Sequence, residues 1–171
     1  MKTKEAVCWK EMTTTTNAAV ALEIRQEWMS LILDGSKTVE VRQYPLPPDL
    51  LHQKVYLLQS PSPSNAATNK SQVPDKVELV EQDSLSLVGW CRFDSVRQYT
   101  SQQAFREDQS LHRIPDDHPL GWPITTHEPE KSTLPLYGWH IASLGTDVPD
   151  SIQKSSLHRR FRSLFEIQES L

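Results

Sequence analysis

Residues 26–42 read QEWMSLILDGSKTVEVR, and this stretch decides the fold that the sequence predicts. Its first half carries apolar side chains at positions i, i+3 and i+4, namely Trp28, Leu31 and Ile32. This spacing places them on one side of an α-helix and predicts two helical turns over residues 26–33. Gly35 follows where a left-handed residue commonly ends a helix. Alternating valines and charges over residues 39–42 then predict a short strand.

Three charged side chains stand together in the second half of this stretch. Alternation along the strand places Glu40 and Arg42 on one face, beside the turn that carries Lys37. Arg42 can hold Glu40 by a two-pronged hydrogen bond, whereas Lys37 keeps donors free for an oxygen or phosphate of a ligand. In a dry cleft, desolvation and Arg42 would lower the pKa of Lys37 while Glu40 would raise it, so spacing leaves the net direction open. We therefore expect a ligand cleft floored by these three side chains.

The same spacing also fits a solvated ladder of ion pairs on an exposed strand. Such surface pairs are common and contribute little to stability, so on spacing alone this is the more frequent arrangement. The two interpretations differ in one observable feature, which is whether Lys37 and Glu40 lie within hydrogen-bond reach of each other in a concave, partly buried site.

The rest of the chain predicts more strands than helices. Four further runs are apolar or alternate in polarity, and they cover residues 18–24, 54–59, 85–93 and 136–144. A short helix presenting Phe105 is predicted over residues 102–111, and the prolines between positions 115 and 135 keep that stretch extended and irregular. Strands separated by short helices, without regular βαβ alternation, predict an α+β fold with a small curved or closed sheet.

Two segments offer little apolar surface to bury. Residues 1–17 are predicted to be a disordered leader. Residues 61–84 are rich in Ser, Pro, Asn, Gln and acids, and they are predicted to be a flexible insertion within a domain that spans residues 18–145. Residues 146–171 follow as a C-terminal extension. Its apolar side chains fall at i, i+4, i+7 and i+8, which favours a helix from about Ser151, but residues 164–167 fit a last strand equally well.

The extension also carries the basic cluster of the chain, made of Lys154, His158, Arg159, Arg160 and Arg162. This cluster is predicted either to contact a nucleic-acid backbone or to form an ordinary solvated face. The full chain of 171 residues has a net charge of −4, which excludes a protein that coats nucleic acid nonspecifically and restricts such binding to a local patch.

Composition narrows the remaining classes of protein. Cys8 and Cys91 belong to no C-x-x-C pair, so we predict neither a zinc site nor a disulfide framework. We expect the protein in a reducing compartment, either the cytoplasm or the nucleus. No run of apolar residues is long enough for a membrane span or a signal peptide. The histidines lack metal-binding spacing and no G-x-S-x-G motif occurs, so no metal site and no serine nucleophile are predicted.

Two aromatic residues are candidates for stacking on bases: Trp122, between a glycine and a proline, and Tyr44, which continues the charged strand face. Trp90 and Trp139 lie in strand patterns that favour core packing, as does the helical position of Trp28. His112 and His140 are interpreted as polar groups near the cleft.

Residues 26–42 resemble the signature of the ASCH domain, whose pattern is roughly Q-x-W-(A/x)-S-L-(I/L)-x-G-x-K-x-x-E-x-R. Later pieces agree in order, namely Leu87-Val88-Gly89, a Phe-bearing helix followed by His112, and Tyr137-Gly138-Trp139-His140-Ile141. The resemblance covers about residues 18–144. Within the family, this segment is similar to the C-terminal domain of activating signal cointegrator. It implies a small PUA-like β-barrel with short flanking helices, and it adds Gln26 and Trp28, which open the motif, to the binding residues.

The function implied by the resemblance varies within the family. Members are associated with RNA or DNA binding, with nucleic-acid cleavage and with hydrolysis of N4-acetylated cytidine. In the small acetylcytidine hydrolases the lysine of the G-x-K motif is catalytic, and that role would fall on Lys37. A catalytic threonine of those enzymes stands where this chain has Glu40, and their later glutamate matches Glu107 only loosely.

We therefore expect binding of RNA or a modified nucleoside, without a cofactor, by a monomer that does not associate with membranes. The alternative is a small hydrolase acting on an N4-acylated cytidine or on RNA, with Lys37 and Glu40 as acid and base. A third interpretation is a protein-interaction module that contacts its partners through the insertion and the basic cluster.

Overall fold

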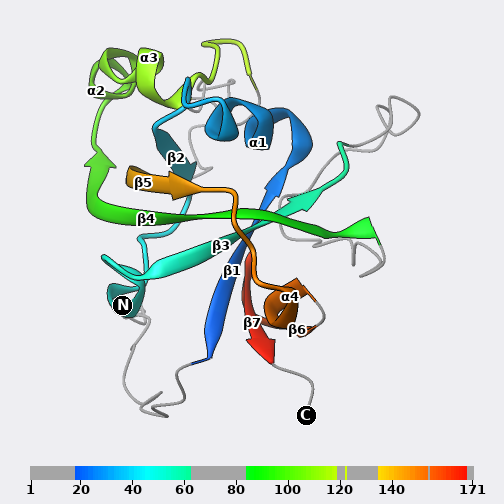
Figure 1. Cartoon of the computed structure of the whole chain (residues 1–171). Helices are drawn as coiled ribbons and strands as arrows, with labels where there is room; N and C mark the ends of the chain where they lie inside the picture. The colour runs from blue at the N-terminus through cyan, green and yellow to red at the C-terminus, as the bar shows by residue number, and fades with distance from the viewer. Residues whose placement is uncertain (1–17, 63–83, 119–121, 123–134, 154, 169–171) are drawn as a thin grey trace, which may run out of the picture.

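Figure 1 shows the computed structural model, which describes residues 18–62, 84–118, 122, 135–153 and 155–168. The predicted leader and all but the ends of the predicted insertion lie outside these residues. Seven strands form one mixed sheet in the order β2-β5-β4-β3-β1-β7-β6. No helix in the described part of the chain is long and apolar enough to cross a membrane.

The strands are β1 (Ala19–Arg25), β2 (Val39–Arg42), β3 (Lys54–Ser60), β4 (Ser86–Tyr99), β5 (Leu136–Gly145), β6 (Ser156–Phe161) and β7 (Leu164–Gln168). The helices of the described residues are α1 (Gln26–Leu33), α2 (Gln102–Glu107), α3 (Gln109–His112) and α4 (Asp150–Gln153), and Pro48–Leu50 form a 3-10 turn. The predicted helix over residues 26–33 and the strand over residues 39–42 are confirmed. The predicted helix over residues 102–111 is divided into α2 and α3.

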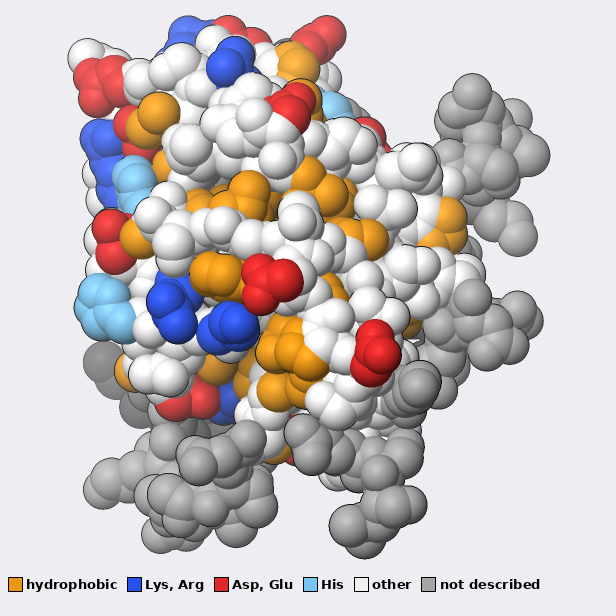
Figure 2. All heavy atoms as spheres, in the orientation of Figure 1, with side chains coloured by type: hydrophobic (Ala, Val, Ile, Leu, Met, Phe, Trp, Pro, Cys, Tyr) orange, Lys and Arg blue, Asp and Glu red, His pale blue; other side chains and the backbone are white. Residues whose placement is uncertain are grey.

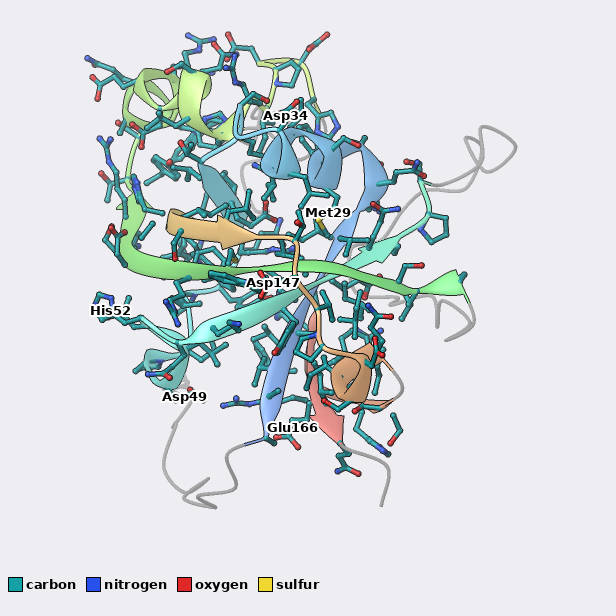
Figure 3. All side chains as sticks on the ribbon, in the orientation of Figure 1. Met29, Asp34, Asp49, His52, Asp147 and Glu166 are labelled. Atoms are coloured by element: carbon teal, nitrogen blue, oxygen red, sulfur yellow. The ribbon has the colours of Figure 1, made fainter. Side chains whose placement is uncertain are left out.

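Side chains on the two faces of the sheet form two separate hydrophobic clusters. Along β1 and β3, which pair in parallel, alternation sends Leu22 and Leu57 to one face and Ala21 and Leu58 to the other. The α1-side cluster contains Met29 of α1 together with buried strand residues, and Figure 3 labels Met29 below that helix. The α4-side cluster is covered by α4. Because both faces are buried, β1 and β3 read as nearly continuous apolar runs.

The long strand β4 bends and thereby positions β5 and β2. Its pairing with β5 shifts register between Arg92 and Phe93 and again between Phe93 and Ser95. Such bulges bend a strand and increase its twist, and Figure 1 shows β4 turning before it reaches α2. The edge strand β2, which pairs with β5, is thereby carried toward α1 and α3.

The sheet is open at its two edge strands, β2 and β6, as far as pairing among the described strands shows. Side-chain hydrogen bonds connect β2 to β1 and to the β6–β7 turn, which are not paired with it through their backbones. The guanidinium of Arg42 donates from Nη2 to the carbonyl oxygen of Glu23 on β1 (2.8 Å) and from Nη1 to Oγ of Ser163 in the β6–β7 turn (2.9 Å). The α+β class predicted from sequence is thus confirmed as a curled mixed sheet with a few short helices.

The β6 and β7 strands form a hairpin. Of the two alternatives predicted here, the last strand over residues 164–167 is confirmed, and the helix from about Ser151 is wrong beyond Gln153. Leu164 is buried in the α1-side cluster and Phe165 in the α4-side cluster, on opposite faces of β7. A helix would place these neighbouring residues close to one another on one side, whereas a strand separates them. Arg162, with φ of 47°, turns the chain between β6 and β7. Because β7 pairs with β1, this predicted extension forms part of the same sheet.

Candidate functional site

The loop between α1 and β2 carries Lys37 to the interior. Gly35 adopts the positive φ of 79° that glycine tolerates best, and the carboxylate of Asp34 accepts a hydrogen bond from the amide of Ser36. The amide of Lys37 then donates to the carbonyl of Leu31, which folds the loop back onto the end of α1. The side chain of Lys37 consequently points under the helix instead of into solvent, and its residue is only 2% exposed.

The ammonium group of Lys37 has three partners. Its Nζ lies 2.8 Å from the carbonyl oxygen of Val39, 2.8 Å from that of His112 and 3.4 Å from Oε2 of Glu40. An ammonium has three N–H donors, so all of them are engaged. The prediction that Lys37 keeps donors free for a ligand is therefore wrong, because the buried amine had to satisfy its hydrogens within the fold.

Burial sets the direction in which the pKa of Lys37 moves. Desolvation lowers the pKa of this ammonium, the charge and hydrogen bond of Glu40 raise it, and Arg42 lowers it further. The result is a pKa below the ordinary value for lysine, which answers the question that spacing left open.

Glu40 and Arg42 complete a buried charged network on β2. Oε1 of Glu40 lies 2.9 Å from Nη2 of Arg42, so each carboxylate oxygen contacts one cation. Two cations against one carboxylate leave an excess of one positive charge. The Nε atom of Arg42 is buried without a hydrogen-bond partner among the described residues. The predicted convergence of Lys37, Glu40 and Arg42 is thus confirmed, and the exposed ladder of ion pairs is not what the structure contains.

Trp28 of α1 contacts the charged network at Lys37. Nζ of Lys37 lies 5.4 Å from the centroid of the Trp28 ring, within the range of a cation–π contact. His118 meets the same indole edge to face, with centroids 5.2 Å apart. Trp28 is half-buried, and Gln26 is exposed at the start of the helix. A half-buried aromatic ring therefore contacts the ammonium of the charged network.

His112, which the sequence analysis interprets only as a polar group near the cleft, has a defined set of partners in the structure. Its Nδ1 accepts from the amide of Ile114 (3.0 Å), so the ring proton is on Nε2, which donates to the carbonyl oxygen of Phe105 (2.9 Å). The imidazole stacks on the Phe105 ring, with centroids 4.1 Å apart. Burial lowers the pKa of His112, and the charge of Lys37 lowers it further. This neutral histidine holds the carbonyl oxygen that binds Lys37.

A second buried acid was missed by the sequence analysis. Asp108, between α2 and α3, accepts from the hydroxyl of Tyr99 (2.9 Å) and pairs with Arg97 (3.0 Å). Burial and the neighbouring carboxylate raise the pKa of the Tyr99 phenol. These contacts attach α2 and α3 to β4 and so fix His112. Nothing in the spacing of residues 97–108 signals such a contact, because it depends on the bend of β4.

Several predicted site residues lie apart from the network. Tyr44 is 7% exposed, packs edge to face on Trp139 and Phe161, and shares a hydrogen bond of 2.6 Å with Oγ of Ser163. Its predicted role as a stacking surface is therefore wrong, because the ring belongs to the core. Glu107 is exposed on α2 and pairs with Arg97 at 3.5 Å, not with Lys37 or Glu40. Trp122 is half-buried against Phe105, with ring centroids 6.1 Å apart, and its role in binding stays a prediction.

The predicted basic cluster is partly neutralised within the fold. Arg159 pairs with Glu23 at 3.7 Å and Arg160 with Asp49 at 2.8 Å, so these guanidiniums are tied to carboxylates. Arg162 lies over the ring of Tyr44, 5.3 Å from its centroid. Lys154 lies outside the described residues. Phosphate binding by this cluster stays a prediction, although alternation along β6 separates Arg159 from Arg160.

An open depression lies away from the charged network, at the α4 side of the sheet. Its volume is about 390 Å³, and its lining combines leucines with serines and a glutamine: Leu58, Leu85, Ser86, Leu87, Gln153, Ser155, Ser156 and Leu157. It brings together none of the predicted site residues. Within the described ranges, no group of three or more His, Cys, Asp or Glu side chains is arranged to hold a metal ion.

No protein-family model and no curated protein matches the sequence. Solved structures similar to this chain include the ASCH protein of Zymomonas mobilis, at 13% identity and a TM-score of 0.45 over 74% of this chain and 68% of that one. Two single-substitution variants of that protein give TM-scores of 0.44 and 0.42, each at 13% identity, covering 74% and 72% of this chain and 68% of theirs. These three solved structures are all of one ASCH protein.

Proposed function

We propose that this protein binds RNA or a modified nucleoside at the surface formed by Trp28 over the Lys37–Glu40–Arg42 network. The observation that carries the proposal is a half-buried tryptophan above a buried charged network with one excess positive charge. Burying charges is expensive and a buried ion pair is weak evidence for stability, so such a network is a candidate functional site. Closure of the curled sheet into the PUA-like barrel that the sequence resemblance implies stays a prediction, because the described strands leave β2 and β6 as open edges.

The hydrogen-bonding capacity left in the network indicates which part of a nucleotide would bind. Lys37 has used its donors, and Arg42 is tied to Glu23 and Ser163. Each oxygen of Glu40 contacts one cation and keeps acceptor capacity. A ligand that stacks on Trp28 and donates to Glu40 is a base with an exocyclic amino group. The same network has little to offer a phosphate directly, which changes the ligand contact expected from sequence.

Titration of unphosphorylated nucleosides tests this proposal. Cytidine, N4-acetylcytidine, adenosine and uridine are titrated calorimetrically against the wild type and Trp28→Ala. Because stacking of a base on an aromatic ring contributes about 1–3 kcal/mol, Trp28→Ala is expected to weaken binding by about 5- to 150-fold.

Trp90→Phe is the matched control, since Trp90 is another half-buried tryptophan on a different element. Its nucleoside affinity should equal that of the wild type. Equal affinities in a folded Trp28→Ala protein, or absence of nucleoside binding by the wild type, would contradict the proposal.

The second candidate function is hydrolysis of an N4-acylated cytidine or of RNA. One observation favours it: burial lowers the pKa of Lys37, and Glu40 lies 3.4 Å from its Nζ, so the two groups can exchange a proton. Water would add to the acyl carbon and the N4 amine would leave, giving cytidine and a carboxylate.

Chromatography of N4-acetylcytidine and RNA after incubation with the protein tests the hydrolase function. Turnover should disappear in Lys37→Met and persist in Glu107→Gln, because Glu107 lies outside the network. Absence of product in the wild type would rule out this second function for these substrates.

A further inference from the structure

A second group of cations lies on the α4 side of the sheet, outside the network already described. Lys54 of β3 and Arg92 of β4 are directly opposite each other in the antiparallel pair. Both contact the indole ring of Trp90, with Nζ of Lys54 4.4 Å and Cζ of Arg92 5.4 Å from its centroid. We call Lys54, Trp90 and Arg92 the Trp90 platform.

The indole of the Trp90 platform is held in place by its neighbours. Nε1 of Trp90 donates to Oδ1 of Asp147 at 2.8 Å. A Cβ at Gly145 would lie 2.5–2.6 Å from three atoms of the indole, so the backbone there approaches the ring as only glycine permits. In Figure 2 basic side chains lie left of the centre of this face beside hydrophobic and acidic ones, and Figure 3 labels Asp147 in the same region. The ring is thus a fixed support for two cations.

The two charges on the platform are only partly balanced by a carboxylate: the pKa of Asp147 is lowered first by its hydrogen bond from Trp90 and also by the charge of Lys54. Five other arginines of the fold pair with carboxylates, namely Arg42, Arg97, Arg106, Arg159 and Arg160. Within the described part of the chain Lys54 and Arg92 have no ion pair; the nearby Asp147 accepts the indole proton of Trp90. Like charges directly opposite on neighbouring strands are destabilising. An anion placed between them would relieve this repulsion.

We propose that Lys54 and Arg92, supported by Trp90, bind consecutive phosphates of a single RNA strand. That the ligand is RNA rests on the function proposed above. That the site binds an anion rests only on the contacts of the Trp90 platform. Its cations are ordered against a ring before any ligand arrives, so less side-chain freedom is lost on binding. The protein therefore has two distinct contacts with RNA: a base contact at Trp28 and a backbone contact at the Trp90 platform.

The salt dependence of RNA binding tests the platform. Fluorescence anisotropy of a labelled short oligouridylate gives the affinity of the full chain at several KCl concentrations. Each phosphate contact to a single strand contributes about 0.7 to the slope of log affinity against log salt, so Arg92→Gln should reduce the slope by about 0.7 and Lys54→Gln/Arg92→Gln by about 1.4.

Arg106→Gln is the matched control for Arg92→Gln. It removes the same charge from another exposed arginine, which pairs with Asp116 on the α2 side of the molecule. Its slope should equal that of the wild type. Thermal melts of all variants establish that each is folded, and Trp90→Phe, which keeps a ring under both cations, should retain most of the slope.

Three results would overturn the platform. The first is an equal slope in the platform variants and in Arg106→Gln, and the second is absence of oligouridylate binding by the wild type. The third is binding to phosphatidylserine vesicles that depends on Lys54 and Arg92 while RNA binding does not, which would assign the site to a membrane surface. Loss of nucleoside binding with an intact platform effect would contradict only the Trp28 site, so the two proposals fail separately.

Discussion

At the scale of single residues, burial decides what the charged motif can do. Lys37 and Glu40 stand at positions typical of a solvated strand, yet their residues are 2% and 6% exposed. In water their pairing would contribute little, whereas in the interior each charge depends on its partners. Lys37 is held by two backbone carbonyls as well as by Glu40, so the network has one fixed geometry. This rigidity fits the ligand contact proposed at Trp28, which lies 5.4 Å from Nζ of Lys37.

His112 should make the stability of the fold depend on pH. Its pKa is lowered in the folded protein, so the unfolded chain takes up a proton first as the pH falls below about 6.5. The contribution of His112 to the free energy of unfolding is then fully present above that pH. It decreases on acidification, by at most about 1.4 kcal/mol per pH unit for one group. Protonation in the fold would also break the bond from the amide of Ile114.

Urea denaturation of the wild type and His112→Asn measures this effect. The measurements run from about pH 5 to 8, a range around the ordinary histidine pKa of about 6.5. His112→Asn should be less stable at neutral pH and should lose part of the slope between stability and pH. His52→Asn, which changes an exposed histidine, serves as control. An identical slope in His112→Asn and the wild type would show that His112 does not titrate with unfolding.

At the scale of elements, the β6–β7 hairpin depends on the conformation of Arg162. Its φ of 47° lies in the left-handed region, which is unfavourable for residues other than glycine by roughly 1–2 kcal/mol. Arg162→Gly should relieve this strain but lose the contact with Tyr44, so its melting temperature should stay within a few degrees of the wild type. Arg162→Val, a β-branched residue, should melt several degrees lower. Calorimetry compares the two, and equal melting temperatures would contradict the argument.

At the scale of the whole molecule, Arg42 joins the two ends of the curled sheet. It connects β2 to β1 through the carbonyl of Glu23 and to the β6–β7 turn through Ser163. Arg42→Ala would leave Glu40 beside a single cation and remove both connections, and breaking a buried pair costs about 3–5 kcal/mol. We expect a loss of that size in urea denaturation, with faster amide exchange in β2.

Arg106→Ala removes an exposed arginine that pairs with Asp116, and it is the control for Arg42→Ala. Surface pairs contribute about 0–1 kcal/mol, so its stability should stay close to that of the wild type. A comparable loss in both variants would mean that the effect of Arg42 reflects charge alone and not the connection across the sheet.

The sequence by itself determined the parts of this protein that depend on neighbouring residues. The helix Gln26–Leu33, the turn at Gly35 and the strand Val39–Arg42 follow from apolar spacing, a left-handed glycine and alternation. The grouping of Lys37, Glu40 and Arg42 also follows, because they lie on one short turn and strand. Spacing of this kind is fixed by local backbone geometry and needs no knowledge of the remaining chain.

Only the tertiary structure decided what surrounds those residues. Lys37 is satisfied by the carbonyl of His112, 75 positions away, and Arg42 by Ser163, 121 positions away. The apolar spacing near the C-terminus suited a helix and a last strand equally well, and the free edge of β1 with the two open faces of the sheet made the strand pairing more favourable. Contacts between distant segments depend on how the sheet bends and which surfaces it leaves to be covered. No local pattern in the sequence contains that information.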